Sequence, residues 1–280
     1  MKKIDTIGAM QAETAQLRQA GRRVALLPTL GALHAGHASL IRLARERGYD
    51  VVVSVFVNPL QFGASEDFGK YPRSVAADAA LCEREGAAVM FAPSAEEMFP
   101  KNFSTTVSED RVSKPLCGVS RTALFRGVLT CWLKLIHIVQ PMALAMGEKD
   151  AQQIAVVRKG LADLSLPMEI ITGPTVRDAD GLALSARNSY LTPTQRDEAL
   201  AVNRALRRAK EMVESGVRSA DRVVAEATHI IGEKRRLRVI YIAVVHPDTM
   251  EAMREVVPGQ SLMAVAFWVD EVRLTDNISL

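Results

Sequence analysis

The stretch LLPTLGALHAGHASLIRLAR, residues 26–45, decides the fold of the first half of the chain. It begins as an apolar run, passes through a turn with Gly31, His34, Gly36 and His37, and continues with apolar residues at helical spacing. This order predicts a buried strand, a turn and an amphipathic helix that begins near His37. Both histidines stand in the turn, where we expect water or a ligand to meet them rather than the core.

Short runs of valine, isoleucine and leucine recur through the first 173 residues, and helix-patterned segments separate most of them. The expected strands cover residues 24–27, 51–57, 88–91, 143–146 and 169–171, and the expected helices cover 38–47, 75–85, 128–139 and 152–163. Strands that are apolar throughout and alternate with helices are typical of a parallel sheet with both faces covered. We therefore predict a doubly wound, Rossmann-like α/β domain over residues 1–173.

The pattern changes after Gly173 and Pro174, which form the best boundary signal in the chain. A loop is expected up to Pro193, then helices over residues 194–214 and 220–233, and strands over 239–245 and 262–269. Residues 174–280 therefore predict a second, smaller α+β domain.

The composition excludes several classes of protein. Lysine and arginine number 35 against 32 for aspartate and glutamate, so the net charge is only +3. The densest basic tract, residues 234–238, has no interleaved aromatic residues, and we expect no nucleic-acid partner. Cys82, Cys117 and Cys131 are odd in number and lack Cys-x-x-Cys spacing, which supports neither a disulfide framework nor a structural zinc site.

Signals for membranes and export are also weak. No apolar run approaches the roughly 18 residues of a membrane span, and Ile4, Asp5 and Thr6 stand where a signal peptide would be apolar. We therefore expect a cytoplasmic protein without a membrane partner, long enough to bury the core of an enzyme.

The histidine turn has the features of a phosphate-binding site. In an open parallel sheet, ligands bind beyond the carboxyl ends of the strands, often at a turn between a strand and a helix. Gly31 and Gly36 allow close backbone approach, and the helix start offers unpaired N–H groups. His34 and His37 add side-chain donors, although a single histidine of this kind is more often an incidental surface or half-buried residue. Their spacing after a predicted strand favours an anion such as a triphosphate.

These residues carry a wider resemblance. The His-x-Gly-His pattern after a first strand resembles the signature of the nucleotidyltransferase superfamily, which contains the class I aminoacyl-tRNA synthetases. Six blocks come in the order and at the spacing of the pantothenate synthetase family, namely PTLGALHAGHASLI, SVFVNPLQF, YPR, FRGVLT, VQPMALAMGEKDAQQ and DGLALSARNSYL. The resemblance covers most of residues 20–195, and residues 200–280 match only loosely. It implies a ligase that uses ATP to condense pantoate with β-alanine through a pantoyl adenylate.

The resemblance also assigns site residues. It implies that His34 and His37 contact ATP, with His37 as the family's nominal proton donor to the departing phosphate. The nucleotide-binding residues that it implies are Leu30, Gly31, Ala32, Leu33, His34, Ala35, Gly36, His37, Gly147, Glu148, Lys149, Asp150, Val176, Leu184, Ser185, Ala186 and Arg187. We expect the smaller domain to close over this ATP site, and Mg²⁺ to be held mainly by the ATP phosphates rather than by a protein metal site.

The chemistry of carboxylate activation supports several of these residues independently. When a carboxylate attacks the α-phosphate of ATP, the protein has to position the reactants and stabilise charge. Lys149 is a flexible cation suited to phosphate oxygens, and it is the third candidate catalytic residue beside the histidines. Ser185 supplies a hydroxyl and Arg187 a bidentate fork, both from a loop that could close over the phosphates. Asp150 could hold the ribose or an outer-sphere cation.

Two glutamines are the implied clamp for pantoate. Gln61 and Gln153 suit a hydroxy acid because a neutral amide both donates and accepts hydrogen bonds. A cation in their place would stabilise the ground-state carboxylate too strongly for it to act as a nucleophile. Asn58, just past the second expected strand, is a further candidate substrate-binding residue. A second copy of the chain, in a homodimer, is the remaining expected partner.

The chain departs from the family pattern in two important places. Residues 122–124 read Thr-Ala-Leu where the family has Pro-Gly-His, and Ala186 replaces a serine of the phosphate loop. Two alternatives therefore stay open: another adenylyltransferase of the same fold, and a weakened or non-catalytic nucleotide-binding paralogue, which Leu124 and Ala186 make conceivable. Retention of both histidines, both glutamines, Lys149 and Arg187 favours a working enzyme.

Overall fold

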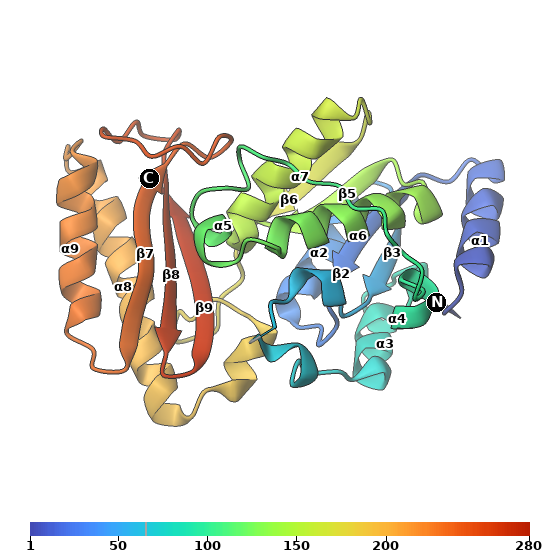
Figure 1. The fold of residues 1–280 in the computed structure, drawn as a ribbon, viewed down its shortest axis with the longest axis horizontal. Coiled ribbons are helices and arrows are strands. Elements are labelled where there is room, and N and C mark those ends of the chain that lie inside the picture. Colours follow the sequence, from blue (N-terminus) through green and yellow to red (C-terminus); the bar gives the residue numbers. More distant parts are fainter. Residues whose placement is uncertain (65) are drawn as a thin grey trace. The chain divides into compact units, whose positions relative to one another are not determined.

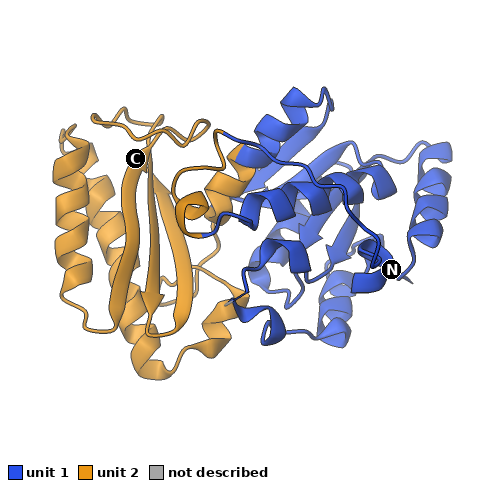
Figure 2. Ribbon diagram, viewed as in Figure 1, with its two compact units in different colours: residues 1–110, 121–148, 156–174 blue, residues 111–120, 149–155, 175–280 orange. Residues whose placement is uncertain are grey.

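The computed structural model describes residues 1–64 and 66–280, which form two compact units (Figure 2). Unit 1 consists of Met1–Asp110, Arg121–Glu148 and Val156–Pro174, and unit 2 consists of Arg111–Ser120, Lys149–Ala155 and Thr175–Leu280. Two short segments of the first 173 residues thus cluster with unit 2, so the compact units differ from a single division of the chain at Gly173. A glycine–proline pair indicates a boundary at one point of the chain, and it cannot indicate short segments elsewhere that pack with the other unit.

Unit 1 is built on one six-stranded sheet, shown with its helices in Figure 1. Its strands are β1 (Lys2–Ile4), β2 (Val24–Thr29), β3 (Asp50–Val55), β4 (Val89–Phe91), β5 (Ala143–Gly147) and β6 (Glu169–Gly173). They lie in the order β1-β4-β3-β2-β5-β6, and every neighbouring pair is parallel. The predicted doubly wound α/β fold is confirmed, with β1 as an additional edge strand that its polar sequence did not indicate.

Helices cover both faces of this sheet because its central strands are apolar on both sides. The helices of unit 1 are α1 (Ile7–Gln19), α2 (Ala35–Glu46), α3 (Val75–Arg84), α4 (Ala95–Met98), α6 (Leu124–Val139) and most of α7 (Ala151–Asp163). One core layer joins α2 and α3 to strand residues such as Ala25, Leu27 and Val53. The alternate residues Val24 and Leu26 point to the opposite face, where α1 and α6 contact β2. Among the described residues, no helix has the length and apolar character needed to cross a bilayer.

The winding direction of the sheet reverses between β2 and β5, which are hydrogen-bonded neighbours. From β2 the chain continues to β3 and β4 on one side, and from β5 it continues to β6 on the other. In doubly wound proteins, ligands bind outside the carboxyl ends of the strands at such a switch point. The histidine turn, which follows Thr29, and the segment that begins at Glu148 both leave the sheet here.

Unit 2 contains a three-stranded antiparallel sheet, β7 (Leu237–Val245), β8 (Leu262–Val269) and β9 (Val272–Ser279). Helices α8 (Pro193–Glu214) and α9 (Ala220–Gly232) pack against it, and the short helix α5 (Cys117–Ser120) belongs to the same unit. The core between sheet and helices includes Leu206, Ile231 and Phe267. The α+β class is confirmed, but the sequence analysis missed β9, because three consecutive polar residues, Thr275 to Asn277, interrupt the alternation that indicates a strand.

Gly127 in α6 lies against a 3-10 turn, η1 (Pro59–Gln61). A Cβ atom at this position would stand 2.1 Å from the carbonyl oxygen of Leu60. The carbonyl oxygen of Gly127 also accepts a hydrogen bond from the Asn58 side chain at 3.0 Å. Glycine alone lets the helix and the turn approach this closely, so Gly127 sets the position of the turn that carries Gln61.

Gly127→Ala is expected to destabilise the protein by about 1–3 kcal/mol, because backbone atoms must move to admit the methyl group. Gly8→Ala in α1 is the matched control, since no neighbouring atom lies within 4 Å of its Cβ position and alanine favours a helix over glycine by about 0.5–1 kcal/mol. Urea unfolding of both variants measures the difference. Equal free energies of unfolding would contradict the close packing of α6 on η1.

Candidate active site

The helix after the histidine turn begins earlier than the sequence analysis expected. Helix α2 starts at Ala35, and its N-cap is His34, whose Nδ1 accepts a hydrogen bond from Gly36 N at 3.2 Å. His37 Nδ1 in turn accepts from His34 N at 3.2 Å, and the two ring centroids lie 4.1 Å apart. The expected start near His37 was wrong because an imidazole nitrogen here takes the place of the serine or aspartate oxygen that usually caps a helix.

These two hydrogen bonds define the tautomer of both rings. A nitrogen that accepts a backbone N–H cannot itself carry a proton, so the proton of each neutral ring is on Nε2. In both neutral rings, Nε2 is therefore the nitrogen that carries the N–H donor. The donor role expected for His34 and His37 thus has a physical basis in the turn itself.

Most backbone N–H groups of the turn already have partners. Gly31 N donates to Thr29 Oγ1 at 3.2 Å, while Ala32 N and Leu33 N donate to the Asp78 carboxylate at 3.1 and 2.7 Å. Asp78 belongs to α3, and its burial raises the pKa of its carboxyl group above the ordinary value. The expectation of unpaired N–H groups concerned the start of the helix, and it was wrong at Gly36, whose N–H already donates to His34 Nδ1.

Asn58 and Gln61 form one hydrogen-bonded unit after β3. Asn58 is 1% exposed, and its Nδ2 donates to Gln61 Oε1 and to Gly127 O, both at 3.0 Å. Its Oδ1 accepts from Leu60 N at 3.1 Å, so both ends of the amide are bound inside the protein. The structure thus places Asn58 as a support for Gln61. Because Gln61 Oε1 is held, its Nε2 is the group that can donate to a ligand.

Arg121 anchors the loop that follows Gln61. Its guanidinium binds both carboxylate oxygens of Glu66, with Nε 2.7 Å from Oε1, and donates to Gln61 O at 3.3 Å. Both partners are largely buried, which shields the ion pair from solvent. Leu124, which stands where the family pattern has histidine, is 7% exposed in the first turn of α6. An apolar side chain therefore fills that place while the Arg121 anchor is intact.

The segment of unit 2 that follows β5 carries two adjacent glutamines with different surroundings. Lys149 lies in the 3-10 turn η3 (Glu148–Asp150), with its Nζ 3.7 Å from Asp150 Oδ1. Gln152, which the sequence analysis did not consider, is buried and bonds backbone groups of residues 112–117 at 2.6 to 3.1 Å. Gln152 therefore fixes that segment, whereas Gln153 beside it is only half-buried.

The last candidate residues lie in a loop of unit 2. Leu184 N donates to Val176 O at 3.0 Å and closes a small hairpin. Ser185 then caps the 3-10 turn η4 (Ala186–Tyr190), and its Oγ accepts from Arg187 N at 3.2 Å. Since Ser185 Oγ accepts this bond, its hydroxyl proton can be donated to a phosphate oxygen.

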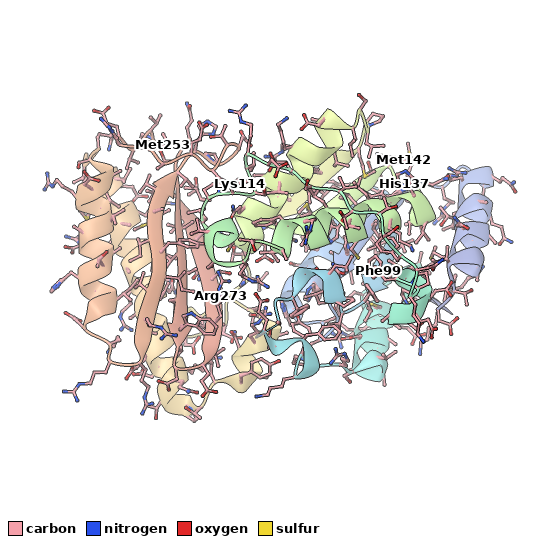
Figure 3. All side chains as sticks on the ribbon, in the orientation of Figure 1. Phe99, Lys114, His137, Met142, Met253 and Arg273 are labelled. Carbon is pink, nitrogen blue, oxygen red and sulfur yellow. The ribbon has the colours of Figure 1, made fainter. Side chains whose placement is uncertain are left out.

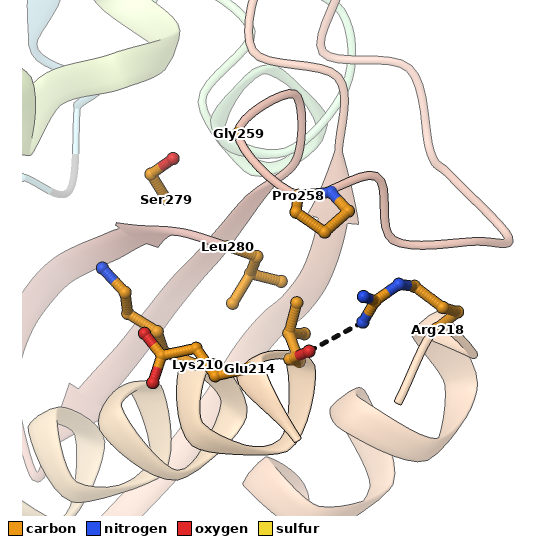
Figure 4. Close-up of a pocket in the computed structure, with 8 residues that line it drawn as sticks. Lys210, Glu214, Arg218, Pro258, Gly259, Ser279 and Leu280 are labelled. Atoms are coloured by element: carbon orange, nitrogen blue, oxygen red, sulfur yellow. Dashed lines mark hydrogen bonds between the residues drawn. The ribbon is translucent and has the colours of Figure 1, made fainter. Parts of the chain in front are cut away.

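A separate hollow of about 380 Å³ lies in unit 2 (Figure 4). It is lined by Lys210, Val213, Glu214, Arg218, Pro258, Gly259, Ser279 and Leu280. Arg218 donates to Val213 O at 2.7 Å near the end of α8, and no candidate site residue lines the hollow. It is therefore not part of the candidate site. In residues 1–64 and 66–280, no group of three or more His, Cys, Asp or Glu side chains is arranged to hold a metal ion.

The fold and the turns of unit 1 define a class of protein. A histidine-capped turn follows β2, and an asparagine–glutamine pair follows its parallel neighbour β3. This is a doubly wound α/β protein with polar turns at the carboxyl ends of its strands. The sequence profile of the pantoate-beta-alanine ligase family matches residues 2–279. The chain belongs to the pantoate–β-alanine ligase family.

Individual relatives are similar to this chain over nearly their full lengths. Pantothenate synthetase of Moorella thermoacetica is 44% identical over 280 residues, which are 100% of this chain and 99% of that protein. Pantothenate synthetase from Thermus thermophilus has a crystal structure with a TM-score of 0.94 at 38% identity, covering 100% of this chain and 99% of the other. The Francisella tularensis ligase, complexed with β,γ-ATP and β-alanine, has a TM-score of 0.82 at 29% identity and coverages of 100% and 97%. The likeness therefore includes residues 200–280, where the quoted blocks match only loosely.

The neutral rings of His34 and His37 are expected to carry their proton on Nε2 in the protein without ligands. Long-range ¹H–¹⁵N correlation spectra distinguish the two tautomers at a pH where the rings are neutral. Free histidine, measured under the same conditions, is the control that should show a mixture of both tautomers. An Nδ1–H signal from either turn histidine would contradict the capping geometry.

Proposed function

We propose that this chain condenses pantoate with β-alanine in two steps driven by ATP. In the first step, a carboxylate oxygen of pantoate attacks the α-phosphorus of ATP, the bond to the bridging oxygen breaks and pyrophosphate leaves. In the second step, the amine of β-alanine attacks the acyl carbon of pantoyl adenylate and AMP leaves. The observation that carries the proposal is the family match over residues 2–279. The Francisella tularensis relative, complexed with β,γ-ATP and β-alanine, supports the same substrates here.

In this proposal the histidine turn binds the triphosphate through imidazole N–H groups. The Nδ1 atoms of His34 and His37 accept backbone N–H groups, which fixes the two rings before ATP arrives and leaves the proton of each neutral ring on Nε2. Donors fixed in advance need no reorganisation when charge develops in the transition state. Release of the Nε2 proton from a neutral ring would leave an imidazolate, so His37 acts as a hydrogen-bond donor to the phosphates rather than as an acid.

Lys149, Ser185 and Arg187 supply the remaining stabilisation of the phosphates. Negative charge moves onto the bridging and pyrophosphate oxygens as the carboxylate attacks, and Lys149 provides a cation for them. Arg187 offers a planar fork that matches two phosphate oxygens, and Ser185 adds one hydroxyl donor. Ala186 provides no such donor, a loss worth about 1.5–3 kcal/mol where the partner is charged. The remaining donors support a slower enzyme rather than an inactive one.

Gln61 and Gln153 are assigned to pantoate. The amide of Gln61 is oriented by Asn58, which binds its oxygen and directs its Nε2 donor to the ligand. A neutral donor orients the carboxylate and hydroxyls of pantoate without suppressing the nucleophilicity of the carboxylate. Asn58 thus acts on the substrate through Gln61, and not by direct contact.

ATP is proposed to bind as its magnesium complex, with the ion held mainly by phosphate oxygens. Reliance on ATP supports action in the cytoplasm, where ATP is made and used. The buried cysteines Cys82, Cys117 and Cys131 suit a reducing compartment. A homodimer is proposed from the family resemblance.

Positional isotope exchange within ATP tests the two-step scheme. ATP labelled with ¹⁸O at the α,β-bridge should scramble its label when pantoate is present, and β-alanine should not be required. Reversible formation of bound pyrophosphate explains this dependence. Exchange that requires β-alanine would exclude the ordered scheme, and ATP binding without exchange or AMP formation would favour a non-catalytic paralogue.

Lys149→Ala should slow the formation of pantoyl adenylate by at least about a hundredfold, the scale for loss of one aimed donor. Supplied pantoyl adenylate should react with β-alanine at a rate much closer to wild type, because pyrophosphate has already left. Lys159→Ala, on the exposed part of α7, is the matched control and should leave both half-reactions unchanged. An equal loss in both half-reactions would mean that Lys149 holds the site together structurally.

A further inference from the structure

Strand β9 of unit 2 holds two separate segments of the candidate nucleotide site. Its consecutive residues Asp276 and Asn277 point to opposite faces of the sheet, because side chains alternate along a strand. Leu274, on the same face as Asp276, packs in the core with α8 and α9. Arg273, on the same face as Asn277 and labelled in Figure 3, donates to Cys117 Sγ at 3.5 Å. The strand therefore contacts different parts of unit 2 through its two faces.

Asp276 holds the hairpin that leads to Ser185 and Arg187. Its carboxylate is 6% exposed and accepts from Arg177 Nη1 at 2.7 Å and from Nη2 at 2.9 Å. Arg177 Nη1 also donates to Gly181 O at 3.2 Å, across the hairpin. A bidentate arginine–carboxylate pair fixes orientation as well as distance. The base of the loop is thus fastened to β9.

Asn277 holds the segment that carries Lys149. Its Nδ2 donates to the carbonyl oxygen of Lys149 at 2.8 Å. Its own backbone N–H donates to Asp276 Oδ1 at 2.8 Å, so the Asp276 carboxylate also holds the backbone of Asn277. A bond to the Lys149 carbonyl fixes the backbone from which the ammonium group extends and leaves the side chain to interact with phosphate.

We propose that Asp276 and Asn277 are positioning residues for adenylyl transfer. From one peptide unit of β9, they set the backbone of Lys149 and the Ser185-to-Arg187 loop relative to each other. This assignment rests on the proposed function, in which both segments contact the phosphates of ATP. Neither β9 side chain touches the substrate in this scheme. Misplacement of an aimed group by about 1 Å can cost on the order of a hundredfold in rate.

Asn277→Asp tests the bond to Lys149, because it keeps the shape of the side chain and replaces the donating NH₂ group by an oxygen. Formation of pantoyl adenylate in a single turnover should slow by at least about tenfold. The reaction of supplied pantoyl adenylate with β-alanine should stay within about threefold of wild type. Asp270→Asn, in the β8–β9 turn where Asp270 pairs with Arg236 at 2.9 Å, is the matched control and should change neither rate.

Double-mutant cycles show whether each residue acts through its assigned partner. Asn277→Asp should have little further effect on adenylate formation in a Lys149→Ala background. In the wild-type background, Asp276→Asn should slow adenylate formation by about tenfold. In an Arg187→Ala background, the same change should have little further effect on that rate. A merely structural role would instead give losses that multiply in every background.

Multiplicative losses, equal losses in both half-reactions, or a normal rate for Asn277→Asp would each overturn the assignment. If the wild-type protein forms pantoyl adenylate and Asn277→Asp forms it at the same rate, the positioning role alone is overturned. Wild-type protein that forms no pantoyl adenylate would overturn the proposed function and this assignment together. Melting temperatures of Asn277→Asp and Asp270→Asn, measured side by side, show whether the first variant loses rate without losing its fold.

Discussion

The parallel pairing of β2 with β5 is the constraint on which the rest of unit 1 depends. Parallel neighbours cannot be joined by a tight turn, so each connection is a crossover, and the strands after β2 and those after β5 lie on opposite sides of this pair. Because the strands are apolar on both faces, polar side chains gather where the strands end. The histidine turn after β2 and the Asn58–Gln61 turn after β3 follow from this arrangement.

Apolar periodicity was sufficient to predict most of the fold. The strand expected at residues 24–27 is found at Val24–Thr29, and the expected class of each unit is confirmed. The elements that were missed have little apolar signal of their own. In strand β9, Thr275 to Asn277 are consecutive polar residues, and the strand owes its conformation to its pairing with β8, which is a tertiary contact.

The candidate site was less predictable, because the polar contacts that shape it join residues far apart in the chain. The motif places His34 and His37 in a turn, but Asp78, which occupies the N–H groups of Ala32 and Leu33, comes from another helix. Asp78 also explains Gly31, whose φ is 83° and whose Cβ would stand 3.1 Å from the Asp78 carboxylate. Glycine at position 31 therefore makes room for the Asp78 carboxylate that binds the turn, and not only for an incoming ligand.

His34 and His37 support the fold of the turn, and the same side chains are proposed to bind the ligand. Each ring accepts a backbone N–H group at the start of α2 through Nδ1, so replacing either histidine changes the fold of the turn as well as its donors. Truncating His34 removes the N-cap of α2, a cost of about 1 kcal/mol in its own right, and truncating His37 removes the reciprocal bond to the N-cap backbone. Activity lost on such truncation therefore overstates what the imidazole contributes to the reaction itself, because part of the loss comes from the altered turn.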